Sequence, residues 1–154
     1  MKSKILMITI YSCFTMMSCK KEAESTKTAI ADAPQVDCYQ AIFEKDTVNL
    51  KINTFKDGTV TGNMTMKQFE TPTKEGEING GYHGDTLMVD YNYKSGTTDK
   101  TNYENPLALL KRGNELIMGN GKIETYLGKT FFVKNAPIDY ENIRFKFTKL
   151  DCVK

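Results

Sequence analysis

Few side chains in this chain of 154 residues have both the type and the spacing that chemistry requires. The clearest pair is Met64 and Met66, which are two residues apart and would share one face of a β-strand. Two thioether sulfurs on one face could bind Cu(I), which is a soft ion. Methionine also fills irregular gaps in protein cores, and both residues fall on the side that we expect to face inward. Core packing is therefore the favoured interpretation, and Cu(I) binding is the alternative.

Three tyrosines are also on the expected inward side of their strands, namely Tyr82, Tyr91 and Tyr93. A buried tyrosine needs a hydrogen-bond partner for its hydroxyl, which backbone, water or a bound ligand can supply. Together with Met64, these tyrosines are our candidate ligand-binding residues.

Other patterns of catalysis and metal binding are missing from the sequence. The single histidine, His83, precedes a predicted turn, and we expect it to be structural or exposed to solvent. One histidine cannot complete a zinc site without several free cysteines. No pair of carboxylates is marked out for acid–base work, and no glycine-rich phosphate loop precedes a helix. We therefore expect a non-enzymatic protein with no catalytic residue, no metal site and no cofactor.

The first nineteen residues carry the strongest local pattern. Two lysines precede an apolar run over residues 5–17, and a serine precedes Cys19, which indicates a secretory signal at residues 1–18. This resembles the lipobox of bacterial lipoproteins, in which the cysteine sulfur receives a diacylglycerol and the freed amine a third acyl chain. The resemblance implies that acyl chains on Cys19 attach the protein to a membrane. Cys13 is the alternative lipidation site. An uncleaved anchor helix is disfavoured, since a bilayer needs roughly 20 apolar residues.

Length and charge restrict the number of domains and the kinds of partner that we expect for the rest of the chain. Without residues 1–18 it would have 136 residues, enough for one domain with a single core. The signal contains two of the 21 basic residues, so 19 basic and 19 acidic residues would remain. A neutral chain without a basic stripe has little electrostatic reason to bind nucleic acid. We expect a monomer with no nucleic-acid partner.

Residues 19–36 are predicted to be the lipidated N-terminus and a flexible tether. The segment is rich in Lys, Glu, Ala, Ser and Thr and has no apolar period, so it cannot bury enough surface to become ordered. A flexible segment of this length spans roughly 20 to 25 Å. No Asp follows Cys19, where the lipoproteins that this segment resembles carry an inner-membrane retention signal. The resemblance therefore favours the outer membrane of the cell envelope.

Cys38 and Cys152 are the predicted disulfide pair, because Cys13 would leave with the signal and Cys19 would carry lipid. An exported compartment is oxidising enough to keep such a bond. A disulfide requires Cα atoms within roughly 7 Å, so the first and last strands of the domain would lie side by side. Two separate buried thiols are the alternative.

The domain at residues 37–154 alternates apolar and polar residues with a period of two, which is typical of half-buried strands. Turn residues separate consecutive runs, as in Lys56, Asp57 and Gly58, so neighbouring strands would be antiparallel. One helical turn could begin at Pro106, and the glycines 119 and 121 indicate a bulge or bend in a long strand. The eight or nine predicted strands are 38–44, 47–55, 59–69, 77–83, 86–94, 107–111, 115–126, 130–134 and 142–150.

An all-β meander with its ends tied together most simply closes into a single antiparallel up-and-down barrel. A two-layer sandwich is the alternative. A barrel of eight strands is either filled by its own side chains, which we favour, or holds one small ligand, for which Gly62 and Gly80 would leave room. The side chains predicted to point inward are Val48, Leu50, Ile52, Val60, Met64, Ile78, Leu87, Val89, Leu116, Met118, Phe131, Val133, Ile143, Phe145 and Phe147.

In its layout the chain resembles the small lipocalin-like lipoproteins of Gram-negative envelopes, including barrels of the NlpE type. The features that carry this resemblance are the signal, the tether, the all-β domain with a cysteine at either end, and Gly84, Asp85, Thr86 and Leu87 opening a strand. The Cys-x-x-Cys pair of the NlpE type and the Gly-x-Trp signature of lipocalins are both missing. No site of the family can therefore be transferred to particular residues.

These observations predict a lipid-anchored, non-enzymatic binding protein of the envelope. In one hypothesis it carries or senses a small apolar ligand inside the barrel. In the other it is an interaction or inhibitor module whose loops contact another envelope protein, which requires an exposed apolar patch near residues 95–106 and 135–140.

Overall fold

The computed structural model describes residues 33–152. The predicted signal peptide, the candidate lipidation sites Cys13 and Cys19, and residues 19–32 of the predicted tether lie outside the described residues. The first strand begins at Gln35, two residues before the predicted start of the domain.

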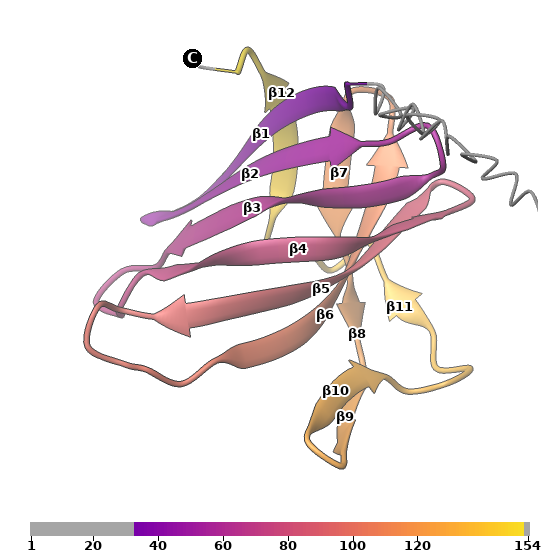
Figure 1. The fold of residues 1–154 in the computed structure, drawn as a ribbon. Coiled ribbons are helices and arrows are strands. Elements are labelled where there is room, and N and C mark those ends of the chain that lie inside the picture. Colours follow the sequence, from indigo (N-terminus) through magenta and orange to yellow (C-terminus); the bar gives the residue numbers. More distant parts are fainter. Residues whose placement is uncertain (1–32, 153–154) are drawn as a thin grey trace, which may run out of the picture. The chain divides into compact units, whose positions relative to one another are not determined.

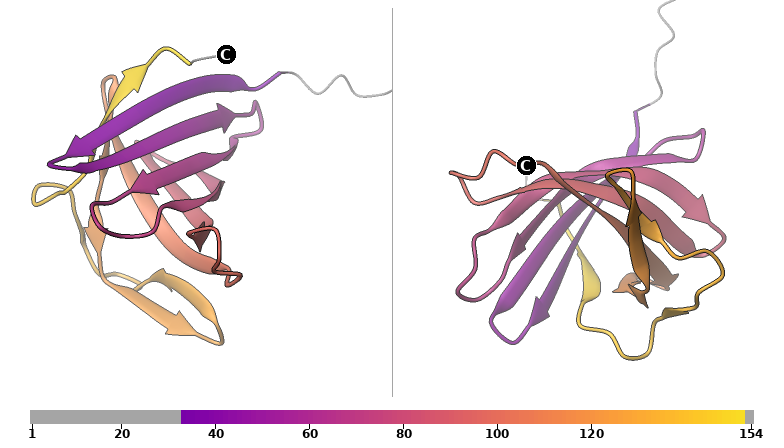
Figure 2. Two further views of the ribbon diagram at one scale, coloured as in Figure 1. Left: turned by 90° about the vertical axis from the view of Figure 1, so that its left-hand side faces the viewer. Right: turned by 90° about the horizontal axis from the view of Figure 1, so that it is seen from below.

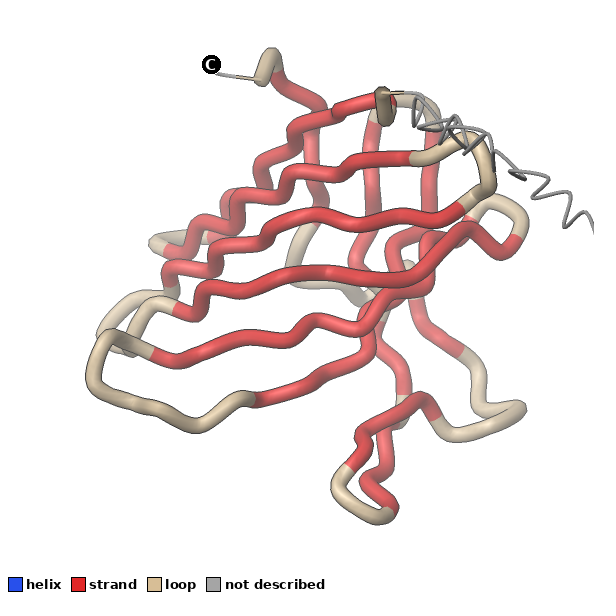
Figure 3. The backbone as a smooth tube through the Cα atoms, in the orientation of Figure 1, coloured by secondary structure: helices blue, strands red, loops and turns tan. Residues whose placement is uncertain are grey.

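Eight antiparallel strands form a closed barrel and follow one another around it (Figure 1). β12 closes the barrel by pairing with both β7 and β1. The described residues contain no helix (Figure 3). The predicted all-β, up-and-down barrel is confirmed, and the two-layer sandwich is excluded. The barrel strands are β1 (Gln35–Phe43), β2 (Asp46–Thr54), β3 (Thr59–Lys67), β4 (Lys74–His83), β5 (Thr86–Ser95), β6 (Tyr103–Arg112), β7 (Glu115–Met118) and β12 (Lys146–Leu150).

The segment between β7 and β12 contains four short strands that are not part of the barrel. Two of them pair as β8 with β11, and two as β9 with β10. β9 and β10 form a two-stranded ribbon that projects from the barrel (Figures 1 and 2). The bounds are β8 (Asn120–Gly121), β9 (Ile123–Tyr126), β10 (Lys129–Phe132) and β11 (Ile138–Asp139).

The prediction of one barrel strand over residues 115–126 is wrong. A Cβ on Gly119 would lie 2.5 Å from the ring of Tyr140, and a Cβ on Gly121 would lie 2.5 Å from the ring of Phe132. Because neither glycine has a side chain, the rings of Tyr140 and Phe132 can pack directly against the backbone at these two positions. The chain leaves the barrel here. The predicted bend is present, and it ends the barrel strand.

The segment predicted at residues 130–134 is likewise not a barrel strand, because β10 pairs only with β9 among the described residues. Phe131 and Val133 therefore do not reach the barrel core. Phe131 is 39 % exposed, whereas Val133 and Ile143 are half-buried outside the core. Alternation with period two is the same in a projecting ribbon as in a barrel strand, so the pattern could not distinguish them.

Residues 107–110 belong to a strand, so the predicted alternative of a helical turn at Pro106 is wrong. β6 pairs with β7 only from Leu109 onward, and Pro106 pairs with Asp90 of β5. Proline is tolerated in a strand where one side of the ladder is free, because it has no N–H to donate. β4 and β6 begin three and four residues earlier than predicted, and β12 begins four residues later.

The barrel core is built from the alternating residues of all eight strands. The remaining residues predicted to face inward form this core, with Met118 partly buried against it. Tyr39, Ala41 and Leu109 also belong to the core, although they are not among the residues predicted to face inward. The buried core residues are Tyr39, Ala41, Val48, Leu50, Ile52, Val60, Met64, Ile78, Leu87, Val89, Tyr91, Leu109, Leu116, Phe145 and Phe147.

The two ends of the barrel differ in their connections. At one end, here called the terminal end, tight turns join the strands, and Cys38 is bonded to Cys152 with their Cα atoms 5.2 Å apart. The predicted disulfide is confirmed. At the other end, here called the loop end, are the β1–β2 turn and the longer segments 68–73, 96–102 and 119–145. The ribbon of β9 and β10 belongs to the loop end (Figure 2).

Candidate functional site

Two of the predicted ligand-binding residues lie in the middle of the barrel core. Met64 on β3 is 1 % exposed and Tyr91 on β5 is 2 % exposed. The hydroxyl of Tyr91 donates a hydrogen bond to the backbone carbonyl oxygen of Met64 over 3.1 Å. Burial raises the pKa of Tyr91 far above its ordinary value. The protein itself therefore supplies the partner that this buried hydroxyl needs.

The two glycines that were expected to leave room inside the barrel do not do so. A Cβ on Gly62 would lie 2.0 Å from the carbonyl oxygen of Lys51, and a Cβ on Gly80 would lie 2.1 Å from that of Met88. The space that a side chain would need is occupied by the backbone of the neighbouring strand. These glycines allow close approach and bending of β3 and β4 rather than creating a cavity.

Tyr82 lies at the terminal end of the barrel, away from Met64 and Tyr91. It is half-buried beside Tyr39 and Asp37, and the carboxylate of Asp37 also binds the ammonium group of Lys149 at 2.6 Å. Burial raises the pKa of Tyr82 and of Tyr39, and the charge of Asp37 adds to both shifts. Asp37, Tyr39, Tyr82 and Lys149 thus form a small polar cluster at the terminal end.

Tyr93 lies at the loop end, where three tyrosines are stacked in sequence. The ring centroids of Tyr91 and Tyr93 are 4.7 Å apart, and those of Tyr93 and Tyr103 are 5.4 Å apart. The ammonium group of Lys74 lies 5.6 Å above the ring of Tyr93, and the amide of Asn105 donates to its hydroxyl over 3.3 Å. The stack runs from the core to the surface, so Met64, Tyr91 and Tyr93 are joined by direct contacts, whereas Tyr82 lies apart from them at the terminal end.

A charged pair covered by aromatic rings closes another part of the loop end. The buried carboxylate of Asp46 binds the guanidinium of Arg144 and accepts a hydrogen bond of 2.8 Å from the backbone N–H of Phe69. The guanidinium of Arg144 also lies 5.3 Å from the ring centre of Phe145, which packs edge-on against Phe43. These contacts tie the β1–β2 turn to the loop after β3 and to the start of β12.

In the described part of the chain, no group of three or more His, Cys, Asp or Glu side chains is arranged so that it could bind a metal ion. Met66 is half-buried and packs against the core beside Met64, as the core-packing interpretation expects. His83 is exposed at the end of β4.

The ribbon of β9 and β10 carries large apolar side chains that no prediction had placed outside the barrel. Its tip is a two-residue turn in which Leu127 has a φ of 49° and Gly128 a φ of 80°. Leu127 is 86 % exposed. Such turns favour asparagine or glycine at the position that Leu127 occupies. We call the four exposed side chains of this ribbon the apolar tip: Ile123, Tyr126, Leu127 and Phe131.

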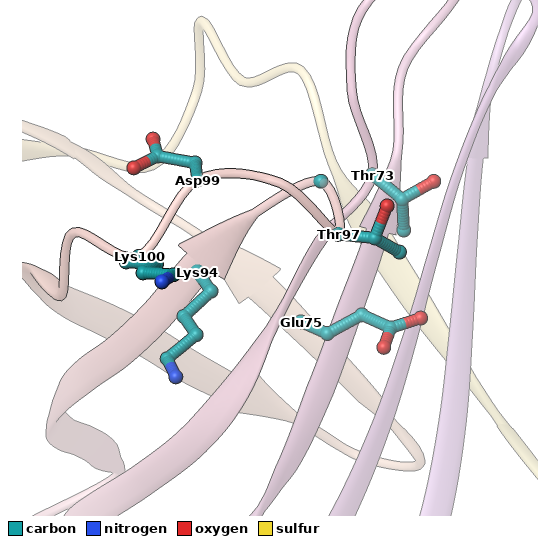
Figure 4. Close-up of a pocket in the computed structure, with 7 residues that line it drawn as sticks. Thr73, Glu75, Lys94, Thr97, Asp99 and Lys100 are labelled. Atoms are coloured by element: carbon teal, nitrogen blue, oxygen red, sulfur yellow. The ribbon is translucent and has the colours of Figure 1, made fainter.

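A polar groove of about 600 Å³ lies on the outer side of β4 and β5, beneath the loop 96–102 (Figure 4). Glu75, Lys94 and Thr97 line it, and Asp99 stands at its rim. The carboxylate of Asp99 accepts hydrogen bonds from the N–H of Thr101 and, over 2.9 Å, from the hydroxyl of Tyr103. These bonds hold the pKa of Asp99 below its usual value. The groove could hold a polar ligand but contains no nucleophile with an activating base.

Comparisons of the chain with models of protein families, with curated proteins and with solved structures gave no match. Among the described residues, no helix is long and apolar enough to cross a bilayer. The fold defines a small disulfide-bonded β-barrel, and this architecture is compatible with a ligand-binding module.

Proposed function

We propose that this chain is a lipid-anchored, non-enzymatic binding protein of the cell envelope that contacts another envelope protein through its apolar tip. The observation that carries the proposal is Leu127, an almost fully exposed leucine at the end of a projecting ribbon. A leucine in the left-handed conformation costs about 1–2 kcal/mol relative to the usual regions. Residues held in such conformations cluster at active sites, ligand clamps and switch regions.

The side chains of the apolar tip project from both faces of the ribbon. Ile123 pairs with Phe132 and shares its face, whereas Phe131 pairs with Glu124 on the opposite face. The remaining exposed aromatic residue, Tyr126, lies beside the turn. A ribbon that exposes large apolar groups on both faces and at its end fits a concave apolar site on a protein partner. This is a different location from residues 95–106 and 135–140, where the sequence had placed the contact.

A small apolar ligand at the loop end is the second candidate function. The stack of Tyr93 on Tyr103 favours it, because Tyr103 is exposed and presents an aromatic surface beside the barrel mouth. A ligand deeper in the barrel would have to separate Tyr91 from Met64. The polar groove beneath the loop 96–102 is not lined by Met64, Tyr82 or Tyr91.

The contact with a protein partner is tested by site-specific photo-cross-linking of the full chain in its own membranes. A photoreactive residue at Tyr126 is expected to give one discrete adduct, and one at the exposed turn residue Asn114 is expected to give none. The key variant is Leu127→Asn, which suits the turn better than leucine. It should raise the free energy of unfolding by about 1 kcal/mol and still abolish the adduct. An adduct that survives this substitution, or equal adducts at both positions, would contradict the proposal.

The anchor is tested separately by Cys19→Ser. The variant should lose acylation and either leave the membrane fraction or retain its signal. Outer-membrane localisation predicts that the wild-type chain co-fractionates with outer-membrane markers. Cleavage and acylation that persist in the variant would move the lipidation site to Cys13.

A further inference from the structure

A second surface, independent of the apolar tip, lies on the outer side of the barrel. The registers of four strand pairs place one residue from each of β2 to β6 in a straight row across the strands. We call it the outer row: Asn53, Thr61, Asn79, Asp90 and Pro106. A parallel row follows beside it: Lys51, Asn63, Glu77, Asn92 and Glu104. Strands are about 4.8 Å apart, so polar groups follow one another at that spacing along both rows, except at Pro106, where the outer row ends.

The amide groups of these rows are available to a ligand. Within the described chain, the side chains of Asn53, Asn63, Asn79 and Asn92 make no hydrogen bond, unlike Asn49, whose amide oxygen accepts from Gln40 over 2.9 Å. Each primary amide has both donors and an acceptor. Alternating donors and acceptors at regular spacing are complementary to the hydroxyl groups of a sugar chain.

Two grooves make this surface more than a flat solvated sheet. One, of about 240 Å³, is lined by Asn53, Thr61, Asn63 and Glu77, and the other has a volume of about 180 Å³. Asn79 lines both grooves, so they are contiguous along the outer row. Each includes a glycine of the bent strands, Gly62 in the first and Gly80 in the second.

The second groove combines apolar and polar groups, and this combination indicates which chemical groups the ligand carries. Its lining includes Met88 and Pro106 beside Asn79 and Asp90. An acetamido group has a methyl that would contact Met88 and Pro106, a carbonyl that would accept from Asn79, and an N–H that would donate to Asp90. The groove therefore suits an N-acetylated sugar residue better than a plain hexose.

The negative charge of the surface disfavours the binding of polyanions. The two rows contain three carboxylates, those of Glu77, Asp90 and Glu104, and a single ammonium group, that of Lys51. A polyanion would be repelled from this excess of negative charge. From the register, the available amides, the grooves and the charge, we propose that the outer row binds a neutral glycan whose residues carry acetamido groups.

Titration calorimetry of the full chain with a β-1,4-linked N-acetylglucosamine tetrasaccharide tests this site. Cellotetraose, which has the same linkage but no acetamido groups, is the matched ligand control. We expect saturable binding of the acetylated tetrasaccharide, weaker binding of cellotetraose and none of polygalacturonate. Absence of saturable binding, or tighter binding of the polyanion, would overturn the site, and equal affinity for the two tetrasaccharides would overturn the acetamido assignment.

Variants decide whether binding occurs at the outer row. Asn79→Ala should weaken binding about threefold to tenfold, which corresponds to one or two lost hydrogen bonds. Asn63→Ala is a second variant at the first groove, and Asn114→Ala, in the exposed turn between β6 and β7, is the control. Thermal unfolding of each variant verifies that the barrel is intact. Unchanged affinity in both groove variants would overturn the proposal, whereas Leu127→Asn should leave glycan binding as it is and so separates this site from the apolar tip.

Discussion

The hydroxyl of Tyr91 and the backbone carbonyl oxygen of Met64 are joined by a hydrogen bond of 3.1 Å between strands that are not neighbours. β4 lies between β3 and β5 and contributes Gly76, which pairs with Met64. A Cβ on Gly76 would lie 2.0 Å from the backbone carbonyl oxygen of Asn92, so this glycine allows the backbones of β4 and β5 to approach closely beside the bond. A residue pair that the sequence suggested for ligand binding thus cross-links the interior of the barrel.

Removal of this hydrogen bond should be measurable as lost stability. Tyr91→Phe leaves the carbonyl of Met64 without its buried partner while it preserves the packing of the ring. We expect the free energy of unfolding in urea to fall by about 1 kcal/mol. Tyr126→Phe, at an exposed position, is the matched control and should change it by less than about 0.5 kcal/mol. A loss at Tyr91 no larger than in the control would contradict the assigned bond.

The same variant should change how stability depends on alkaline pH. Burial raises the pKa of Tyr91 in the folded state, so the unfolded chain loses this proton first, near the ordinary value of 10.0. The stabilisation is complete below pH 10 and is lost as the pH rises above it. We expect the stability of Tyr91→Phe to fall less steeply with rising alkaline pH than that of the wild type. Part of the fall should remain in the variant, because burial also raises the pKa of Tyr39 and of Tyr82. Unfolding curves between pH 8 and 11 test this, and identical slopes for both proteins would refute it.

The pair of Asp46 and Arg144 should behave as a coupled unit. Arg144→Ala leaves a buried carboxylate with only the N–H of Phe69 as partner. Breaking a buried pair costs about 3–5 kcal/mol, but half of the Arg144 side chain is exposed, so we expect a coupling of about 1–2 kcal/mol. A double-mutant cycle with Asp46→Ala measures this coupling. Strictly additive effects would mean that the pair does not stabilise the loop end.

The disulfide should account for a large part of the stability of this small barrel. Its cysteines are 114 residues apart, and closing a loop of that size contributes about 4–5 kcal/mol in the chain-entropy model. Replacement of Cys38 and Cys152 by serine should lower the free energy of unfolding by that order. Reduction of the wild-type protein should give the same loss, whereas the double variant should not respond to the reductant. A wild-type barrel unaffected by complete reduction would contradict this expectation.

The two methionines provide a test for copper. If Met64 and Met66 are packing residues, their replacement by leucine should cost less than about 1.5 kcal/mol each, as volume-conserving substitutions do. Neither the wild type nor the double variant should then bind Cu(I). Stoichiometric Cu(I) binding that is present in the wild type and lost in the variant would establish the alternative interpretation.

The sequence by itself determined the barrel strands up to β7, the inward faces of those strands and the disulfide of this protein. Val48, Leu50 and Ile52 alternate with polar residues, and a one-residue slip would turn all three toward water, so burial fixed their orientation. The pairing of Cys38 with Cys152 followed from the assignment of the other two cysteines to the signal and the lipid anchor.

Only the tertiary structure decided what the chain does after β7. Phe131 alternates with its neighbours as a barrel residue would, yet it lies on the projecting ribbon, because Gly119 and Gly121 pack against rings from later in the chain. Such contacts join residues that are distant in sequence, and a local period contains no information about them. The outer row has the same origin, since Asn53, Asn79 and Asp90 are aligned only by the register between strands.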